Sequence, residues 1–233
     1  WQFGREASGV DSVREAVREQ LKMGANFIKL IATGGVMTKG VDPGATQFTL
    51  EELIAGVEEA RKAGKRTATH AQGTEGIKNS LRAGVNSIEH GFFLDDEAIE
   101  LMQEMNAYLV PTLNAPYQII RGGVKRGVPR YAVEKSKAVM KSHFQSVRRA
   151  YKSKIPIAMG TDAGTPFNCH GENLKEMELL VKAGMTTMEA VVATTKTASE
   201  VLGLEKKIGT LEKGKLADLV VVDGGPVKDI RLL

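Results

Sequence analysis

One stretch decides the fold: Lys154-Ile155-Pro156-Ile157-Ala158-Met159-Gly160-Thr161-Asp162-Ala163-Gly164. It is a short apolar run, bounded by proline and glycine, that ends in the carboxylate of Asp162. Such a run predicts a buried strand with Asp162 at its carboxyl end. Enzymes built from parallel strands and helices place their chemistry at that end. The alternative is that Asp162 only caps a turn or the following helix.

Upstream of this stretch, a helix, a glycine stop and a short strand recur in series. Amphipathic spacing predicts helices over residues 11–23, 49–63, a segment ending at Gly84, 96–105, 131–152, 172–184 and 186–202. The predicted strands cover residues 26–32, 66–69, 85–89 and 107–110, followed by the run before Asp162. Residues 36–48 and 113–129 are rich in glycine and proline and are predicted as loops. The series is typical of an α/β fold with a parallel sheet.

The number of strands sets the domain organisation. Five strands of the serial type are predicted, whereas a closed parallel barrel has eight. Either the sheet is open or about three βα units lie upstream, and a start at Trp1 rather than Met favours the second. We expect a partial barrel domain over 1–203. Residues 204–233 contain two strand-like runs joined by a turn, which predict a small C-terminal β-sandwich element.

Composition excludes several classes of function. The 233 residues are 42% hydrophobic and 26% charged, with a net charge of +4, as in soluble globular proteins. Aromatic residues make up only 5% and do not interleave with basic runs, which argues against nucleic-acid binding. No apolar run is long enough for a membrane span. The single cysteine, Cys169, excludes an internal disulfide and favours a cytoplasmic location; the sequence leaves open a homo-oligomer.

Three side chains with metal-binding chemistry follow predicted strands. His70, His90 and Asp162 each lie at a strand's carboxyl end, where parallel strands converge on one crevice. Imidazoles and carboxylates suit zinc and similar divalent metals. Lys29 lies inside a strand, where a buried amine loses its charge and can add carbon dioxide to form a carbamate. Counted from the preceding glycines, Lys29 comes one residue earlier than the histidines, so the strand period leaves its direction open.

Two further histidines complete the set of four. His143 lies in the helix predicted over 131–152, and we expect it at the surface or at the edge of the core. His170 lies in the polar loop after Asp162 and is a candidate contact for the substrate.

Four motifs follow one another: Ile28-Lys29-Leu30-Ile31-Ala32-Thr33-Gly34-Gly35, Thr69-His70-Ala71, Ile88-Glu89-His90-Gly91 and Gly160-Thr161-Asp162-Ala163-Gly164. In this order they resemble the amidohydrolase superfamily, above all its imidazolonepropionase-like and Xaa-Pro or Xaa-Arg dipeptidase-like members. The tail from Gly209 to Val220 is similar to the stretch where that family returns to its small β-sandwich. The resemblance implies a (β/α)8 TIM-type barrel, of which this chain supplies about the last five βα units.

The resemblance also implies a binuclear metal site. Lys29, carboxylated, would bridge two divalent ions, with zinc the first choice; His70 and His90 would bind one ion and Asp162 the other. A hydroxide between the metals would attack the amide or peptide carbonyl of a dipeptide or N-acyl amino acid. Asp162 would act as general base and then as general acid. The alternative is a cyclic amide hydrolase or deaminase of the imidazolonepropionase-like kind.

One family motif is absent. The first barrel strand of that family carries a His-x-His pair, whereas the histidines here are His70, His90, His143 and His170. We expect an upstream N-terminal segment to supply the pair. The alternative is a non-catalytic or incomplete fragment.

Overall fold

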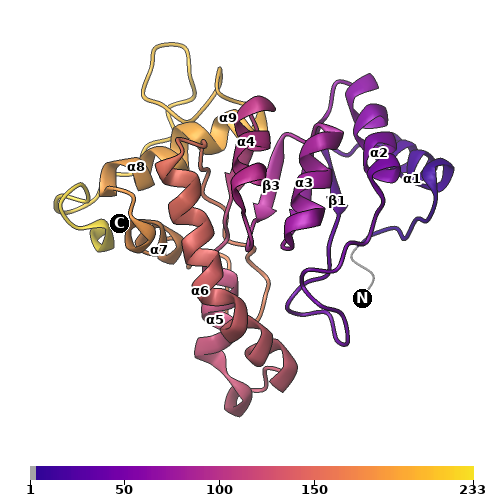
Figure 1. Ribbon diagram of the computed structural model, residues 1–233. Helices are drawn as coiled ribbons and strands as arrows, with labels where there is room; N and C mark the ends of the chain where they lie inside the picture. Colours follow the sequence, from indigo (N-terminus) through magenta and orange to yellow (C-terminus); the bar gives the residue numbers. More distant parts are fainter. Residues whose placement is uncertain (1–3) are drawn as a thin grey trace.

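The computed structural model describes residues 4–233, which form a parallel sheet with helices packed along its outer face (Figure 1). The strands are β1 Phe27–Ile31, β2 Arg66–Ala71, β3 Ser87–His90 and β4 Tyr108–Val110. They pair in the order β1-β2-β3-β4, and every pair is parallel. A helix between consecutive strands produces this sequential order. The predicted α/β fold with a parallel sheet is confirmed.

The helices follow the predicted series. They are α1 Val10–Lys22, α2 Leu50–Lys62, α3 Thr74–Ala83, α4 Asp96–Glu104, α5 Asn114–Gly122, α6 Arg130–Lys152, α7 Lys175–Ala183, α8 Thr187–Val192 and α9 Ala198–Leu202. Short turns of other helix types are η1 Val124–Arg126, η2 Ala193–Thr197 and η3 Ile230–Leu232; η2 is π-helical. The loop predicted over 113–129 is wrong, because α5 and η1 occupy it. Pro116 lies in the first turn of α5, where a helix does not need the missing N–H.

The stretch that ends in Asp162 lies beside β4 but pairs with it through a single bridge, Leu109 to Ile157. Leu109 N–H donates to the Pro156 carbonyl at 3.0 Å, and Ala158 N–H donates to the Leu109 carbonyl at 2.9 Å. Beyond this bridge, Met159 N–H donates to the Ala193 carbonyl in η2. The predicted fifth strand is therefore reduced to a single bridge at the expected position beside β4, and the next N–H group donates to a helical turn instead of a strand.

The two faces of the sheet differ in burial, and β1 shows this by its alternation. Ile28 and Leu30 are buried, and Leu30 reaches α2 at Gly56, where an added Cβ would lie 3.1 Å from a Leu30 methyl group. Phe27, Lys29 and Ile31 point to the opposite face and are exposed. The helix-covered face carries the core, while the other face of β1 is open.

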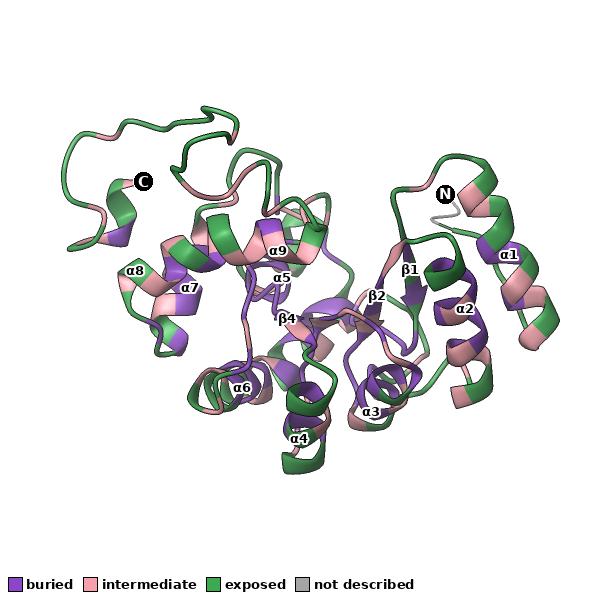
Figure 2. Ribbon diagram, turned by 90° about the horizontal axis from the view of Figure 1, so that it is seen from above, coloured by how far each residue is buried: buried purple, intermediate pink, exposed green. Residues whose placement is uncertain are grey.

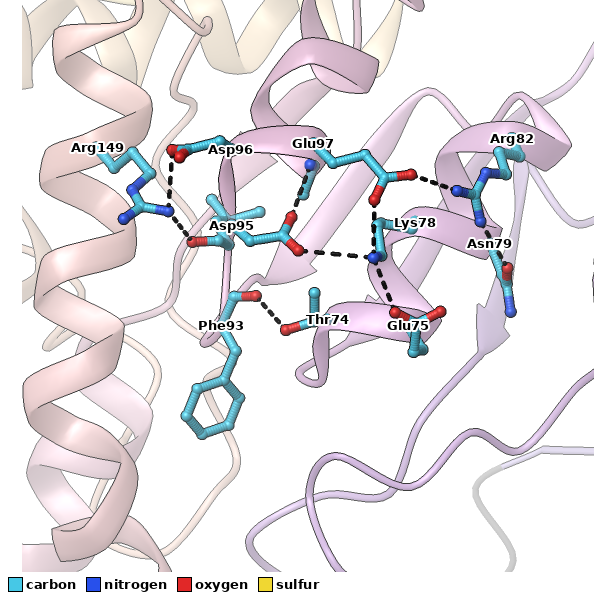
Figure 3. A network of polar contacts seen from close by, with 12 residues as sticks. Thr74, Glu75, Lys78, Asn79, Arg82, Phe93, Asp95, Asp96, Glu97 and Arg149 are labelled. Carbon is cyan, nitrogen blue, oxygen red and sulfur yellow. Dashed lines mark hydrogen bonds and ion pairs between the residues drawn. The ribbon is translucent and has the colours of Figure 1, made fainter.

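Ion pairs tie neighbouring helices together on the outside of the fold (Figure 3). Lys78 of α3 contacts Glu75 at 2.8 Å, Glu97 of α4 at 3.0 Å and Asp95 at 3.6 Å. Arg149 of α6 pairs with Asp96 at 3.3 Å. Each exposed pair contributes at most about 1 kcal/mol, so the network mainly fixes how the helices pack. Across residues 4–233, no helix combines the length and apolar character that crossing a membrane requires.

The strands expected in residues 204–233 are absent from this structure, where the segment is an extended chain with turns (Figure 2). Its apolar side chains are exposed, with Leu211 at 82%, Val220 at 87% and Val221 at 95%. A strand needs a neighbouring edge for its backbone groups and a covered face for its side chains. The described residues offer this segment neither along most of its length; at its end, Ile230 of η3 lies in the core and Leu233 packs against it. The small β-sandwich stays a prediction.

Candidate functional site

His70 points from β2 toward the loop after β1. Its Nε2 atom lies 3.1 Å from the Gly34 carbonyl. A carbonyl only accepts, so Nε2 carries the proton and Nδ1 keeps its lone pair. The ring fits there because residue 35 is a glycine, whose added Cβ would lie 3.2 Å from the ring. The glycine pair after β1 therefore makes room for His70 and fixes its tautomer.

His90 joins His70 although the strand register places it out of phase. His70 pairs with Glu89, and His90 pairs with Ala71, so strict alternation would send His90 to the helix side of the sheet. His90 instead has a left-handed backbone with φ 75°. Its ring meets that of His70 edge to face, with centroids 4.5 Å apart. A local turn of the backbone thus brings the two imidazoles together.

Both imidazoles are kept neutral. Burial lowers the pKa of His70, and so does the charge of Lys29, while the Gly34 carbonyl and Asp162 raise it. Burial lowers the pKa of His90 well below its ordinary value, with further lowering from His70, Lys29 and His143. A neutral imidazole is the form that binds a metal.

Lys29 lies on the same face of the sheet as His70, because it pairs with Ala68, two residues before His70. This settles the direction that the sequence left open. Its side chain is exposed rather than buried. Glu89, in register with His70, is a carboxylate that the sequence reasoning missed. Burial raises the pKa of Glu89. The charge of Lys29 lowers this pKa, and the charge of Asp162 raises it.

Asp162 follows the bridge beside β4 and also has a left-handed backbone, with φ 55°. Its charge raises the pKa of both His70 and Glu89, so its carboxylate lies within electrostatic reach of both. Its carbonyl accepts from Asn168 Nδ2 at 3.0 Å and from Thr165 Oγ1 at 3.0 Å. Asp162 is exposed, while its backbone is fixed by these hydrogen bonds.

A buried polar chain connects Asp162 with the turn after β4. Asn168 is 1% exposed and accepts from Asn114 Nδ2 at 2.7 Å. Glu176 of α7 accepts from the backbone N–H groups of Leu113 at 2.8 Å and Asn114 at 2.6 Å. Burial raises the pKa of Glu176 to about 8, although these two donors lower it. Asn168 and Glu176 were not foreseen, since nothing in their sequence context distinguishes them from ordinary polar residues.

The other two histidines differ in position. His143 is fully buried on α6, so its expected place at the surface or the core edge is wrong. Its Nε2 donates to the Pro111 carbonyl at 2.8 Å, and burial lowers its pKa to about 3. The carbonyl pairing is what lets an imidazole enter the core. His170 is exposed on the loop after Asp162, and its contact with a substrate stays a prediction.

The donor set fits a divalent metal in part. Two neutral imidazoles lie against each other, and the amine of Lys29 and the carboxylate of Asp162 are both close enough to shift the pKa of His70. Within residues 4–233, however, no three His, Cys, Asp or Glu side chains gather closely enough to hold an ion. A cleft of about 660 Å³ runs along the edge strand β1 and includes Lys29 but neither histidine in its lining. Of the four ligands expected in this chain, the described residues thus bring two, His70 and His90, into direct contact.

The sequence profile of the Amidohydrolase family matches residues 2–233. The chain belongs to this family. The amidohydrolase chain is 34% identical over 228 residues to the ochratoxinase of Aspergillus niger, covering 97% of itself and 46% of that protein. Among solved structures, it is similar to a Xaa-Pro dipeptidase with methionine bound in the active site, with 40% identity and a TM-score of 0.91 over 97% of this chain and 55% of that one.

A second solved structure similar to this amidohydrolase is a prolidase complexed with N-methylphosphonate-L-proline. It has 31% identity and a TM-score of 0.91, over 98% of this chain and 55% of that one. The chain thus spans about half the length of the relatives it matches. The resemblance found in the four motifs is confirmed at the level of family and fold.

Proposed function

We propose that this chain carries part of the active site of a metal-dependent hydrolase that cleaves the amide or peptide bond of a dipeptide or N-acyl amino acid. The observation that carries the proposal is the convergence of His70 and His90, at 4.5 Å between ring centroids, beside Lys29 and Asp162. The named activities of the relatives, an ochratoxinase, a Xaa-Pro dipeptidase and a prolidase, support the substrate class.

Four residues would hold the metals: His70 and His90 through neutral imidazoles, Asp162 through its carboxylate, and Lys29 as a carbamate. Two bound divalent ions, zinc first, supply a Lewis acid for the carbonyl and lower the pKa of water. The Gly34 carbonyl leaves Nδ1 of His70 free to bind. Asp162 accepts the proton of the attacking water and passes it to the leaving nitrogen, which needs an exposed carboxylate on a fixed backbone.

The remaining ligands are part of the same proposal. A His-x-His pair from an upstream segment would complete the second metal's shell, because the chain has no such pair of its own. His170 would contact the substrate from the loop after Asp162.

The first experiment measures metal content by elemental mass spectrometry on protein purified without chelator and supplied with bicarbonate. About two equivalents per chain are expected when the His-x-His ligands are present. Turnover is then measured on Xaa-Pro and Xaa-Arg dipeptides, N-acyl amino acids and cyclic amides. Cleavage of linear amides supports the proposal, and turnover of cyclic amides alone favours the imidazolonepropionase-like alternative.

Two results would oppose the proposal. One is the absence of bound metal together with the absence of turnover, even after the His-x-His segment is added as a longer protein; this favours a non-catalytic chain. The other is turnover that survives loss of Lys29, His70 and His90, which would place the chemistry elsewhere.

A further inference from the structure

Thr112 lies at the end of β4 in an unusual conformation. It is 2% exposed and its φ is 55°. The left-handed region is a genuine outlier for a β-branched residue. Strained backbone of this kind persists where the surrounding structure holds it, and it clusters at functional sites. The side chain of Thr112 is therefore the feature to explain.

The hydroxyl of Thr112 contacts two polar groups, the Pro111 carbonyl and the His90 imidazole. Its Oγ1 donates to the Pro111 carbonyl at 2.7 Å and lies 2.6 Å from Nδ1 of His90. A hydroxyl has one proton, and a carbonyl can only accept. Both contacts are satisfied only when the proton points to Pro111 and His90 donates from Nδ1. Nε2 of His90 is then the nitrogen with a free lone pair.

The turn that aims this hydroxyl is held from two helices. His143 of α6 donates from Nε2 to the same Pro111 carbonyl at 2.8 Å. Glu176 of α7 accepts from the next two amides, Leu113 and Asn114. Hydrogen bonds therefore hold the Pro111 carbonyl, the Thr112 hydroxyl and the next two amides in place. They fix the direction in which Oγ1 of Thr112 points.

We infer that Thr112 is a positioning residue that locks His90 in the Nδ1–H tautomer and presents Nε2 to a divalent metal; this rests on the proposed function. Hydrogen-bonded partners of metal-binding histidines act in this way, fixing tautomer and ring direction. The sequence places Thr112 at a strand end, like His90 and Asp162, yet a hydroxyl at that position carries no signal of its own.

The test uses two substitutions at position 112 and one matched control. Thr112→Val keeps the β-branched shape and removes the hydroxyl, while Thr112→Ser keeps the hydroxyl. The control is Thr69→Val, a threonine of β2 that is fully buried and whose Oγ1 has no hydrogen-bond partner among residues 4–233. It measures the effect of removing a buried hydroxyl beside the site without touching His90.

The first readout is the histidine tautomer in metal-free protein, from long-range ¹H–¹⁵N spectra. The four histidines are assigned with His70→Gln, His143→Gln and His170→Gln, which leave His90 by elimination. Wild type, Thr112→Ser and Thr69→Val should show His90 protonated on Nδ1. Thr112→Val should show a mixture or protonation on Nε2. Wild-type His90 protonated on Nε2 would overturn the inference, and this result does not require either position-112 variant to fold.

The second readout is the dissociation constant for Zn²⁺, from competition with a chromogenic chelator. Thr112→Val should bind about 10- to 100-fold more weakly, whereas Thr112→Ser and Thr69→Val should stay within about twofold of wild type. Equal affinity of Thr112→Val and wild type would overturn the inference. If wild type binds no zinc even when the His-x-His segment is present, the proposed function fails, and the tautomer spectra still decide the role of Thr112.

Discussion

The two ends of the sheet turn through the same left-handed backbone but use different residues. At the amino end, the residues that stop a helix before each strand are Gly24, Gly64, Gly84, Asn106 and Lys154, with φ between 51° and 92°. At the carboxyl end, the residues with a left-handed backbone are His90, Thr112 and Asp162, with φ between 55° and 75°. Glycine is the usual residue at a helix end of this kind. Three of the five amino-end positions are glycine, whereas all three carboxyl-end positions keep a side chain at a cost of about 1–3 kcal/mol each.

This difference separates residues chosen for backbone shape from residues chosen for their side chains. An added Cβ at Gly24 or Gly64 would find no atom within 4 Å, so nothing around these positions needs a side chain. At the other end, His90 meets His70, and Thr112 contacts His90. Strain without a packing or capping reason therefore marks the candidate site.

The largest effect is expected at Asp162. Asp162→Asn should lower kcat by about 10²- to 10⁴-fold, because it removes the proposed general base. Its thermal unfolding temperature should stay close to wild type, since the carboxylate is exposed. Asp162→Gly should be equally inactive and no less stable, as the glycine relaxes the left-handed backbone. Turnover retained in either variant would remove Asp162 from the mechanism.

Glu176 should make stability depend on pH. Its pKa is raised from 4.5 to about 8 in the folded protein, so the native state binds the extra proton and the free energy of unfolding falls as pH rises between these values. The slope is at most about 1.4 kcal/mol per pH unit. Buried His143, with its pKa lowered to about 3, acts in the opposite direction below its ordinary pKa of about 6.5.

The measurement is urea denaturation of chelator-treated wild type and Glu176→Gln between pH 6.5 and 8, above the range in which His143 contributes. Gln stays neutral, so the variant should lose much of the downward slope. Identical slopes in the two proteins would mean that Glu176 is already ionised when folded, with its two backbone donors outweighing its burial.

Asn168 tests whether the backbone of Asp162 needs its support. Asn168→Ala removes the donor to the Asp162 carbonyl and the acceptor for Asn114. The Asp162 carbonyl keeps Thr165 as a donor, whereas the buried Asn114 amide loses its acceptor at a cost of about 1–3 kcal/mol. We expect kcat to fall about tenfold with little change in KM. The control is Asn79→Ala, which loses one 3.4 Å contact with Arg82 and should change neither kcat nor KM. Unchanged kcat in Asn168→Ala would show that Asp162 keeps its position unaided.

The smallest effect is expected at the amino end. Lys154→Gly should raise the free energy of unfolding by about 0.5–1 kcal/mol, because φ 60° favours glycine. Turnover should not change, since Lys154 is exposed and remote from the carboxyl ends of the strands. Loss of turnover in Lys154→Gly would contradict the view that the left-handed residues at the amino end serve only the backbone. Chemical denaturation and steady-state kinetics on the same preparation provide both values.

The sequence predicts the helices and strands of the first four units because their signals are local: an apolar stripe, a glycine stop and a short strand. It also places His70, His90 and Asp162 at strand ends. It does not predict how His90 faces His70, because a reversed φ at one residue overrides the strand period. The buried position of His143 depends on the Pro111 carbonyl, 32 residues away.

Two segments show what local patterns miss. Residues 113–129 look like a loop because of Pro116 and three glycines, yet proline is compatible with the first turn of α5. Residues 204–233 have strand-like composition, but a strand forms only against a partner edge, which composition does not reveal. Asn168 and Glu176 matter through hydrogen bonds to distant backbone groups, so only the folded chain identifies them.

Lys29 has a second role when this chain is studied without the upstream βα units proposed above. It lies on the edge strand β1 between Phe27 and Ile31, which are 48% and 49% exposed. A charged residue on an edge strand discourages pairing with another copy. Lys29→Met would make the exposed face of β1 apolar from residue 27 to residue 31. We expect this variant to aggregate and lose soluble yield, which would hide any effect on catalysis. Lys29→Arg keeps a positive charge at this position but cannot form the proposed carbamate, so it is the variant with which to separate catalysis from aggregation.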